Sequence, residues 1–272
     1  MRGGPVTLDR LKEEESRFFA AIHSFSMKTA LVTGAASGIG AAIAERFLEA
    51  GYQVALFDLD GPAAAATASR IICEPRKLVL AGDVADEEQV KTAVQRTVTE
   101  LGSLDVLINN AGIEINGTIV DMTAEQWDRQ LAVNLRGVFL CSKYAIPPLR
   151  DHNGSIINIS SVHAFASWPQ CPAYDASKSA LIGLTRAMAL DHGRDGVRVN
   201  AICPGYIETA LLQRWFATGI VTKEEVLKFH PLGRIGTPND VAEVALFLAS
   251  DAASFISGTS ITVDGALTTA GH

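Results

Sequence analysis

From Thr29 onward the chain alternates short apolar runs, rich in β-branched residues, with longer stretches of helical periodicity. Such alternation is typical of βαβ units, in which a helix connects each strand to a parallel neighbour. It predicts a single-domain α/β fold, a doubly wound parallel sheet of seven strands with helices on both faces. The seven expected strands are Thr29–Thr33, Gln53–Asp58, Lys77–Gly82, Val106–Asn109, Ser155–Ser160, Arg198–Ile202 and Thr259–Val263.

Capping residues mark helix starts between these strands. Three pairs have capping-box spacing and one threonine precedes a proline: Asp86 with Gln89, Thr123 with Gln126, Thr222 with Glu225, and Thr237-Pro238. No repeat, low-complexity tract or linker follows residue 29, so we expect residues 28–272 to form one domain. Residues 1–27 form an N-terminal extension, and Met27 could itself be a translation start. We weight a frayed or artefactual extension above a functional arm.

Composition narrows the class of ligand. Of the 272 residues 48% are hydrophobic and 19% are charged, which is enough apolar material for one large core. A net charge of −7 offers no cationic field for nucleic acid or for an anionic membrane, so neither is an expected partner. The four cysteines form no CxxC pair, and no Cys/His cluster has metal-ligand spacing. With no apolar run long enough for a membrane span and no leader-like N-terminus, we expect a cytoplasmic protein with reduced thiols.

A glycine-rich turn follows the first strand. Residues 33–40 read TGAASGIG, and glycines at 34, 38 and 40 permit a tight turn and close approach of the backbone to a pyrophosphate. The next strand ends at Asp58, whose carboxylate would accept the ribose hydroxyls of adenosine and repel a 2′-phosphate. Neither Ser37 nor Leu59 supplies a cation for that phosphate, which favours NAD over NADP. The pattern predicts a Rossmann-type dinucleotide site, and we weight a plain turn followed by a strand end below it.

A tyrosine and a lysine four residues apart lie in the helix expected at residues 174–190. Their spacing places the Tyr174 phenol and the Lys178 ammonium on one helix face, where the cation would favour a phenolate. The same spacing also occurs on ordinary helix surfaces. Here, however, it follows Ser160 and Ser161, which end an apolar strand at the sheet edge where α/β proteins bind ligands. Together these features predict Tyr174 as a proton donor and acceptor.

From about residue 28 to 265 the sequence resembles the compact, single-domain short-chain dehydrogenases/reductases. The resemblance rests on motifs in the same order: TGAASGIG at 33–40, Asp83-Val84, Asn109-Asn110-Ala111-Gly112, Asn134, Ser161, YDASK at 174–178 and Pro204-Gly205. It implies that Ser161 is the catalytic serine that holds the substrate oxygen. It also implies that Asn134, inside the long helix after Thr123, helps to hold a water linking Lys178 to solvent, and that Lys178 binds the nicotinamide ribose.

The resemblance further implies a cofactor site for NAD. Asp83 and Val84 would lie near the adenine, Asn110 to Gly112 along the cofactor, and Ile207 with Thr209 near the carboxamide. The expected cofactor residues are Gly34, Ser37, Gly38, Ile39, Gly40, Asp58, Asp83, Val84, Asn110, Ala111, Gly112, Tyr174, Lys178, Pro204, Gly205, Ile207 and Thr209. One departure lies after the last strand, where the family often has VDGG and this chain has VDGA at 263–266.

These inferences predict an NAD-dependent oxidoreductase that transfers a hydride between the nicotinamide and a secondary alcohol or its ketone. Residues 208–235 would form a substrate flap. Glu114 and His163 at the mouth of the pocket indicate a polyol or sugar-type substrate, because buried polar groups suit a ligand with extra hydroxyls. The apolar Phe165 and Trp168 argue against it, and Trp168 and Trp215 are the other two expected substrate contacts. The alternative, in which His163 caps its loop and Glu114 points into water, carries at least equal weight.

Two other functions remain open from the sequence. One is an epimerase or dehydratase on the same fold, although related epimerases need a separate substrate domain. The other is a catalytically silent NAD-sensing protein, which would be expected to have a broken catalytic set. The family resemblance also implies that the helices near 123–149 and 174–190 pair with symmetry mates, as a dimer or, in preference, a homotetramer.

Overall fold

The computed structural model describes residues 27–219 and 221–269, and the expected fold is confirmed. Seven parallel strands form one sheet in the order β3-β2-β1-β4-β5-β6-β7. The strands are β1 (Thr29–Thr33), β2 (Gln53–Asp58), β3 (Lys77–Ala81), β4 (Val106–Asn109), β5 (Ser155–Ile159), β6 (Arg198–Pro204) and β7 (Ser260–Val263). Because the chain reverses its direction of travel across the sheet between β1 and β4, a crevice is expected there, at the carboxyl ends of the strands.

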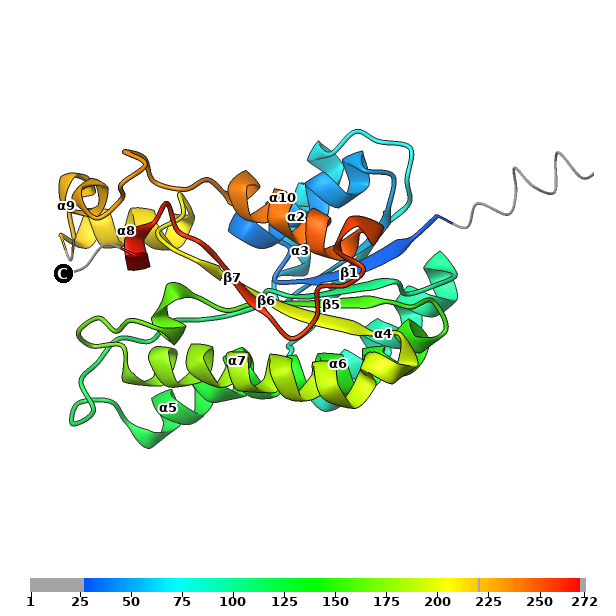
Figure 1. The fold of residues 1–272 in the computed structure, drawn as a ribbon, viewed down its shortest axis with the longest axis horizontal. Helices are drawn as coiled ribbons and strands as arrows, with labels where there is room; N and C mark the ends of the chain where they lie inside the picture. The colour runs from blue at the N-terminus through cyan, green and yellow to red at the C-terminus, as the bar shows by residue number, and fades with distance from the viewer. Residues whose placement is uncertain (1–26, 220, 270–272) are drawn as a thin grey trace, which may run out of the picture.

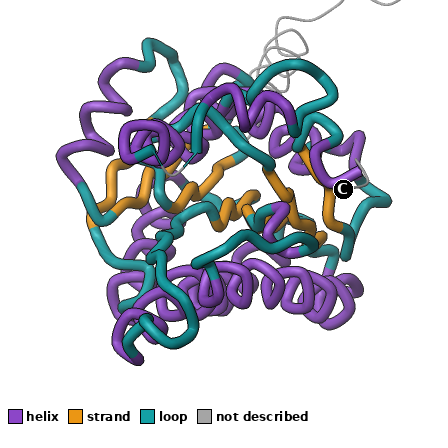
Figure 2. The backbone as a smooth tube through the Cα atoms, turned by 90° about the vertical axis from the view of Figure 1, so that its left-hand side faces the viewer, coloured by secondary structure: helices purple, strands orange, loops and turns teal. Residues whose placement is uncertain are grey.

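Helices cover both faces of the sheet, as Figure 1 shows from the side and Figure 2 from one end. One layer holds α2 (Gly38–Glu49), α3 (Gly61–Arg70) and α10 (Pro238–Ala249), and the other holds α4 (Glu87–Leu101), α5 (Ala124–Leu131), α6 (Gly137–Arg150) and α7 (Pro172–His192). Two short helices, α8 (Ala210–Thr218) and α9 (Lys223–Lys228), lie beyond one end of the sheet. The expected helices therefore form. They cover the two faces of the sheet and leave the carboxyl ends of the strands to loops.

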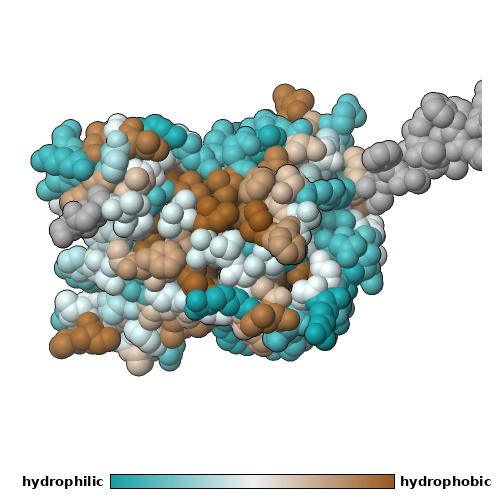
Figure 3. Space-filling view, viewed as in Figure 1, coloured by the Kyte–Doolittle hydropathy of each residue, from teal (hydrophilic) through white to brown (hydrophobic). Residues whose placement is uncertain are grey.

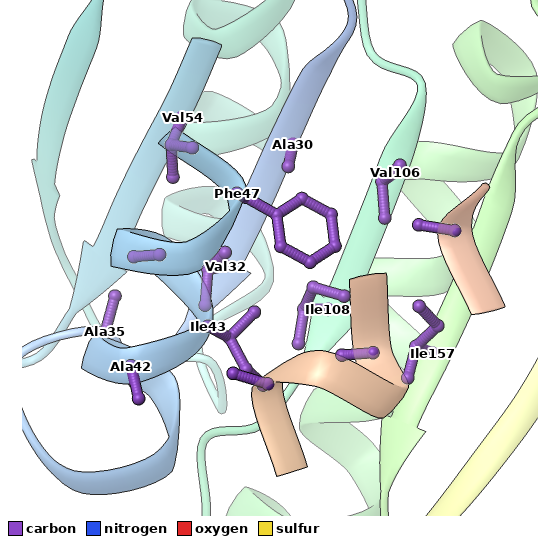
Figure 4. Close-up of a cluster of buried hydrophobic side chains, with 14 of the residues drawn as sticks. Ala30, Val32, Ala35, Ala42, Ile43, Phe47, Val54, Val106, Ile108 and Ile157 are labelled. Carbon is purple, nitrogen blue, oxygen red and sulfur yellow. The ribbon is translucent and has the colours of Figure 1, made fainter. Parts of the chain in front are cut away.

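Two apolar cores hold the layers together, one on each face of the sheet. Between the sheet and α2, the ring of Phe47 packs among Val32, Ile43 and Ile108 (Figure 4). On the opposite face, Leu107 and Ile156 are fully buried against residues of α4 and α6. Strands that are buried on both faces consist of continuous apolar runs, and such runs made these strands easy to predict from the sequence.

Element boundaries differ from expectation by one or two residues. β3 and β5 end one residue early, β7 begins at Ser260, and β6 continues to Pro204 because Cys203 and Pro204 pair with Thr262 and Val263 of β7. The helix expected from Tyr174 begins at Pro172, since proline suits the first helical position. The capping boxes at Thr123 and Thr222 form, whereas at Asp86 the Gln89 side chain bonds instead to the Asp83 N–H and the Asp86 carboxylate.

The segment expected as a substrate flap has a small core of its own. Leu212, Val226 and Ile235 are buried there, and Tyr206 and Trp215 pack against them. The N-terminal extension lies outside the described residues, apart from Met27. In the part of the chain that is described, no helix has the length and apolarity needed to cross a membrane.

Candidate active site

Glycines in the turn after β1 stand where side chains would not fit. Gly34 adopts φ +65°, and a Cβ at Gly40 would lie 2.0 Å from the Gly34 carbonyl oxygen, so neither position tolerates a side chain easily. Ser37 precedes α2 without a side-chain cap, so its hydroxyl does not occupy the first N–H groups of the helix. These N–H groups are donors of the kind that bind a pyrophosphate.

Asp58 braces this turn from the end of β2. Its carboxylate accepts the backbone N–H of Ala36 at 2.9 Å and that of Asp60 at 2.9 Å, and each oxygen retains a lone pair for a further donor. A cation that the sequence spacing did not reveal, Arg70, is linked to this turn. Arg70 donates to the Thr67 hydroxyl, which donates to the Ala36 carbonyl at 2.8 Å.

The remaining residues expected near the cofactor line the same edge of the sheet. The Asn110 side chain donates to the carbonyls of Thr33 and Gly34, which ties the end of β4 to the glycine-rich turn at the crevice. A Cβ at Gly38 would lie 3.4 Å from Thr209, which brings the segment after β6 beside the turn. After β3, the Asp83 carboxylate pairs with Arg129 at 2.9 Å.

The four expected catalytic side chains converge at the carboxyl ends of β4 and β5. Lys178 is buried, its Nζ donates to the Ile159 carbonyl at 2.8 Å, and it lies 5.5 Å from the centre of the Tyr174 ring. The Ser160 hydroxyl is committed to the Lys178 carbonyl, whereas Ser161 hydrogen-bonds to the Tyr174 phenol. This division of roles favours Ser161 over Ser160 as the residue that meets a substrate.

Asn134 reaches the site through a break in its helix. The sequence predicts one long helix after Thr123, but a π-helical turn at Ala132–Arg136 separates α5 from α6 and contains Asn134. Its Oδ1 accepts the Ile113 N–H at 2.8 Å, and its Nδ2 donates to the Ile113 carbonyl and to Ser177. A Cβ on Gly112 would touch both Asn134 Oδ1 and Lys178 Nζ, so the two side chains lie on either side of that glycine. Such π-turns often occur at functional sites.

The electrostatics of the pair differ from the sequence-based expectation. Burial, followed by the nearby Glu114 carboxylate, raises the pKa of Tyr174 well above its ordinary range, although the bond from Ser161 acts in the opposite direction. Burial also lowers the pKa of Lys178 from 10.5 to about 8. Lys178 alone therefore does not produce a phenolate near neutral pH, and further positive charge has to act on the phenol.

Glu114 lies among the catalytic groups, half-buried, and does not point freely into water. Its Oε1 accepts hydrogen bonds from Asn116 Nδ2 at 3.0 Å and from the Cys171 thiol at 3.6 Å. Burial raises its pKa, while the bonds from Asn116 and Cys171 and the nearby His163 oppose that shift. Because its charge also affects Tyr174, Lys178 and Tyr206, the carboxylate is central to the site.

His163 begins a line of ring contacts that continues into the expected flap. Its Nδ1 bonds to Asp175 Oδ1 at 2.5 Å, and its ring lies edge-on to Tyr174, with ring centres 5.0 Å apart. Trp168 packs on His163, and Tyr206 meets both Trp168 and Trp215 edge-on. Three of the four residues expected to contact substrate, His163, Trp168 and Trp215, thus belong to one connected wall, while Glu114 bonds to Asn116 and Cys171.

Comparison with known proteins assigns this architecture to a family. Residues 34–268 match the family model described as enoyl-(acyl carrier protein) reductase. Meso-2,3-butanediol dehydrogenase of Serratia marcescens is 39% identical over 90% of this chain and 96% of its own length. For 2-(R)-hydroxypropyl-CoM dehydrogenase of Xanthobacter autotrophicus the identity is 40%, over 89% and 98%. The chain belongs to the short-chain dehydrogenase/reductase family.

The solved structures agree with that membership. The ligand-free aldohexose dehydrogenase of Thermoplasma acidophilum superimposes on this short-chain dehydrogenase/reductase with a TM-score of 0.81, at 38% identity over 90% of this chain and 95% of that one. The family is one of oxidoreductases that use a nicotinamide cofactor. The glycine-rich turn, the open start of α2 and the Asp58 carboxylate fit the pyrophosphate and ribose of such a cofactor.

Three polar neighbours of this site were not predicted from the sequence. Asp175 lies inside the YDASK motif but reaches back to His163, and Tyr206 follows Pro204-Gly205 but turns toward the aromatic wall. Gln130 holds the residue after Glu114 by accepting the Ile115 N–H at 2.9 Å. Only Gln130 had a usable signal, since it stands four residues before Asn134 and therefore one helical turn away.

Proposed function

We propose that this chain is an NAD-dependent dehydrogenase of small secondary alcohols that carry a neighbouring hydroxyl, such as polyols or sugars, and that it also reduces the corresponding ketones. The observation that carries the proposal is the convergence of Ser161, Tyr174, Lys178 and Asn134 beside a dinucleotide cradle. An intact catalytic set favours an enzyme over a silent NAD-sensing protein. An epimerase or dehydratase on this fold is disfavoured because the described chain forms a single sheet with no separate substrate domain.

In the oxidative direction, Ser161 donates a hydrogen bond to the substrate oxygen and orients it toward Tyr174. The Tyr174 phenolate takes the hydroxyl proton, and the electron pair of the carbinol C–H bond leaves as hydride, so that the alcohol loses two electrons and becomes a ketone. When bound in the cradle formed by the glycine-rich turn and Asp58, an oxidised nicotinamide cofactor would supply the hydride acceptor and positive charge near the site. Lys178 adds further positive charge to the same phenol, and Asn134 holds the backbone of Ile113 at the edge of the site.

NAD is favoured over NADP because the Asp58 carboxylate would repel a 2′-phosphate. A hydroxyl-bearing substrate is favoured because Glu114 and the His163–Asp175 pair lie beside the catalytic phenol. The relatives support the same class by their names, which include a butanediol and an aldohexose dehydrogenase. The flap at residues 208–235 would supply Trp215 to this pocket.

A homotetramer is also part of the proposal. An open groove of about 470 Å³ on the outer face of α5, α6 and α7 is lined mainly by apolar side chains, including Leu131, Leu135, Phe139 and Leu184. A second apolar surface lies near β7, the edge strand of the sheet: Phe255, in the segment before β7, is fully exposed. Figure 3 shows apolar side chains gathered in the middle of the face seen in Figure 1. Two separate apolar surfaces suit the two kinds of contact in a tetramer with dihedral symmetry. The four free thiols are consistent with a cytoplasmic location, which we also propose.

The test is NAD reduction by the purified enzyme with a panel of polyols, sugars and cyclohexanol. Tyr174→Phe keeps the ring and removes the proton-transfer group, so turnover is expected to collapse while NAD still binds. Turnover close to that of the wild type would contradict the mechanism, and no NAD reduction with any alcohol or ketone pair would favour the sensor.

Substrate class is tested with two further variants. Glu114→Ala and His163→Ala should each reduce kcat/KM for a turned-over polyol by about tenfold, the equivalent of one hydrogen bond, and affect cyclohexanol much less. Equal losses on both substrates, or no turnover of any polyol, would remove the polyol assignment and leave the general dehydrogenase.

A further inference from the structure

Two buried amides lie one helical turn apart on the stretch that joins α5 to its π-turn. Asn134 holds both backbone groups of Ile113, with bonds of 2.8 and 2.9 Å. Gln130 accepts the N–H of Ile115 through its Oε1 at 2.9 Å. The residue between Ile113 and Ile115 is Glu114. Three backbone groups flanking this carboxylate are therefore fixed from a single rigid element, and we name Gln130 and Asn134 the amide clamp.

The Glu114 side chain, whose backbone neighbours the amide clamp holds, has one carboxylate oxygen that accepts no hydrogen bond from a described residue. Asn116 and Cys171 both donate to Glu114 Oε1, and no described residue donates to Oε2. No lysine or arginine in the described residues pairs with this carboxylate, although His163 and Asp175 lie within electrostatic range. A carboxylate with an open oxygen beside the catalytic phenol is suited to accept a hydroxyl hydrogen of an uncharged substrate. It is unsuited to a substrate whose second group is anionic.

As a purely structural residue, Gln130 would lower the stability of the fold relative to an apolar side chain of the same shape. Its side chain is fully buried, yet its Nε2 has no hydrogen-bond partner in the described part of the chain. The Ile115 N–H needs an acceptor, so the amide oxygen is fixed toward it and the amide nitrogen is left unpaired. An unpaired buried donor destabilises a fold, whereas an apolar side chain of the same shape does not. The benefit of an amide at this position is therefore confined to the bond with Ile115.

From this arrangement we propose that Gln130 is a positioning residue for substrate specificity, which holds Glu114 so that Oε2 accepts the second hydroxyl of a vicinal diol. The inference rests on the proposed function of the site. It adds to that site a residue that does not itself contact the substrate. Gln130 touches neither substrate nor cofactor, and it acts through the backbone of Ile115. Its loss should therefore change which alcohol is preferred, while Tyr174 remains the proton-transfer group.

The experiment compares propylene glycol with isopropanol, two secondary alcohols that differ by one hydroxyl, using the full chain with saturating NAD. Gln130→Met keeps the length of the side chain and removes both polar groups, and Gln130→Glu keeps an oxygen to accept the Ile115 N–H. We expect Gln130→Met to lower the kcat/KM ratio of the two alcohols about tenfold, mainly through KM for propylene glycol. Gln130→Glu should retain most of the preference. The Tm of Gln130→Met should stay within about 4 °C of the wild type, because one unpaired N–H is removed while another is created.

A double-mutant cycle separates positioning from a general structural role. In a Glu114→Ala background, Gln130→Met should cause no further loss of preference, since the group that it positions is gone. An unchanged alcohol preference in Gln130→Met, or an equal loss on both alcohols, would overturn the inference. If the wild type does not prefer propylene glycol, the proposed substrate class fails independently. The pH profile for isopropanol then decides. Glu114→Gln removes a charge that raises the pKa of Tyr174, so the pH at which activity rises should fall, and Gln130→Met should move it in the same direction. An unmoved profile for Gln130→Met overturns the role of the amide clamp.

Discussion

At the scale of single residues, the Asp58 carboxylate is predicted to decide which dinucleotide is used. It accepts two backbone N–H groups at the end of β2, and under the proposed cofactor preference it would repel a 2′-phosphate. NAD should exceed NADP in kcat/KM by well over tenfold, the equivalent of about 1.4 kcal/mol or more. Asp58→Ala should narrow that preference without changing the pH profile of catalysis. Steady-state kinetics with both cofactors measures it, and equal use of the two by the wild type would contradict the argument.

Arg70 provides a control that the sequence alone did not suggest. Its guanidinium is linked to the same turn through Thr67 and Ala36. If it is the cation that meets a 2′-phosphate once Asp58 is gone, then Asp58→Ala with Arg70→Ala should use NADP less well than Asp58→Ala alone. Arg70→Ala in the wild-type background should leave NAD kinetics nearly unchanged.

Lys178 is expected to set the pH response of Tyr174, the proposed proton-transfer residue. Burial lowers the pKa of this ammonium to about 8, so it loses its charge near pH 8 instead of near 10.5. Below about pH 8 the charge favours the phenolate, and above it this help is lost. Lys178→Met removes the charge at every pH, so turnover should fall, and both the rise of alcohol oxidation with pH and its optimum should move upward by about one pH unit or more. A profile of kcat/KM against pH that keeps its limb would show that Lys178 acts only by binding the cofactor.

Which residues the sequence could identify follows from their distance along the chain. Tyr174 and Lys178 are one helical turn apart, and Gly34, Gly38 and Gly40 share one turn, so local spacing was enough to bring them together. The contact of Glu114 with Cys171 joins residues 57 positions apart, and that of Tyr206 with Trp168 joins two different loops. Such contacts depend on how loops fold over the sheet edge, which no local pattern records.

At the scale of elements, the same contrast separates strands from loops. All seven strands were predicted to within two residues because strands buried on both faces must be apolar. The π-turn at Ala132–Arg136 was missed because it keeps helical periodicity on either side and is defined only by its hydrogen bonds. Its effect is large, because it places Asn134 at the site.

The turn after β7 carries a strain that can be relieved. Ala266 adopts φ +68°, a left-handed conformation that costs a residue with a Cβ about 1 kcal/mol, and it stands where relatives often have the second glycine of VDGG. Ala266→Gly should raise the free energy of unfolding by about 1 kcal/mol, or the Tm by about 2 to 4 °C. Ala65→Gly, on the exposed face of α3, should lower stability by a similar amount and serves as a control of opposite sign. A loss of stability in Ala266→Gly, measured by thermal unfolding, would contradict the strain.

At the scale of the whole molecule, the proposed tetramer depends on apolar surfaces that a monomer would leave in water. Phe139 is 50% exposed on α6, at the groove lined by Leu131, Leu135 and Leu184. Exposed apolar area of this kind marks protein interfaces, and the unpaired edge strand β7 with Phe255 offers a second one. Each surface faces away from the catalytic groups, so assembly would stabilise α6 and α7 without blocking the site.

Light scattering of purified variants tests this assembly. Phe139→Glu places a charge in one interface and Phe255→Glu places a charge in the other, so each should convert the tetramer to a smaller species, and the two together should give a monomer. Ile72→Glu alters an apolar residue between α3 and β3 that is as exposed as Phe255, and it should leave the tetramer intact. Because α7 carries Tyr174 and Lys178, the Phe139→Glu species should also lose thermal stability and part of its turnover. A wild-type monomer, or a tetramer that survives both charges, would show that these surfaces serve another purpose.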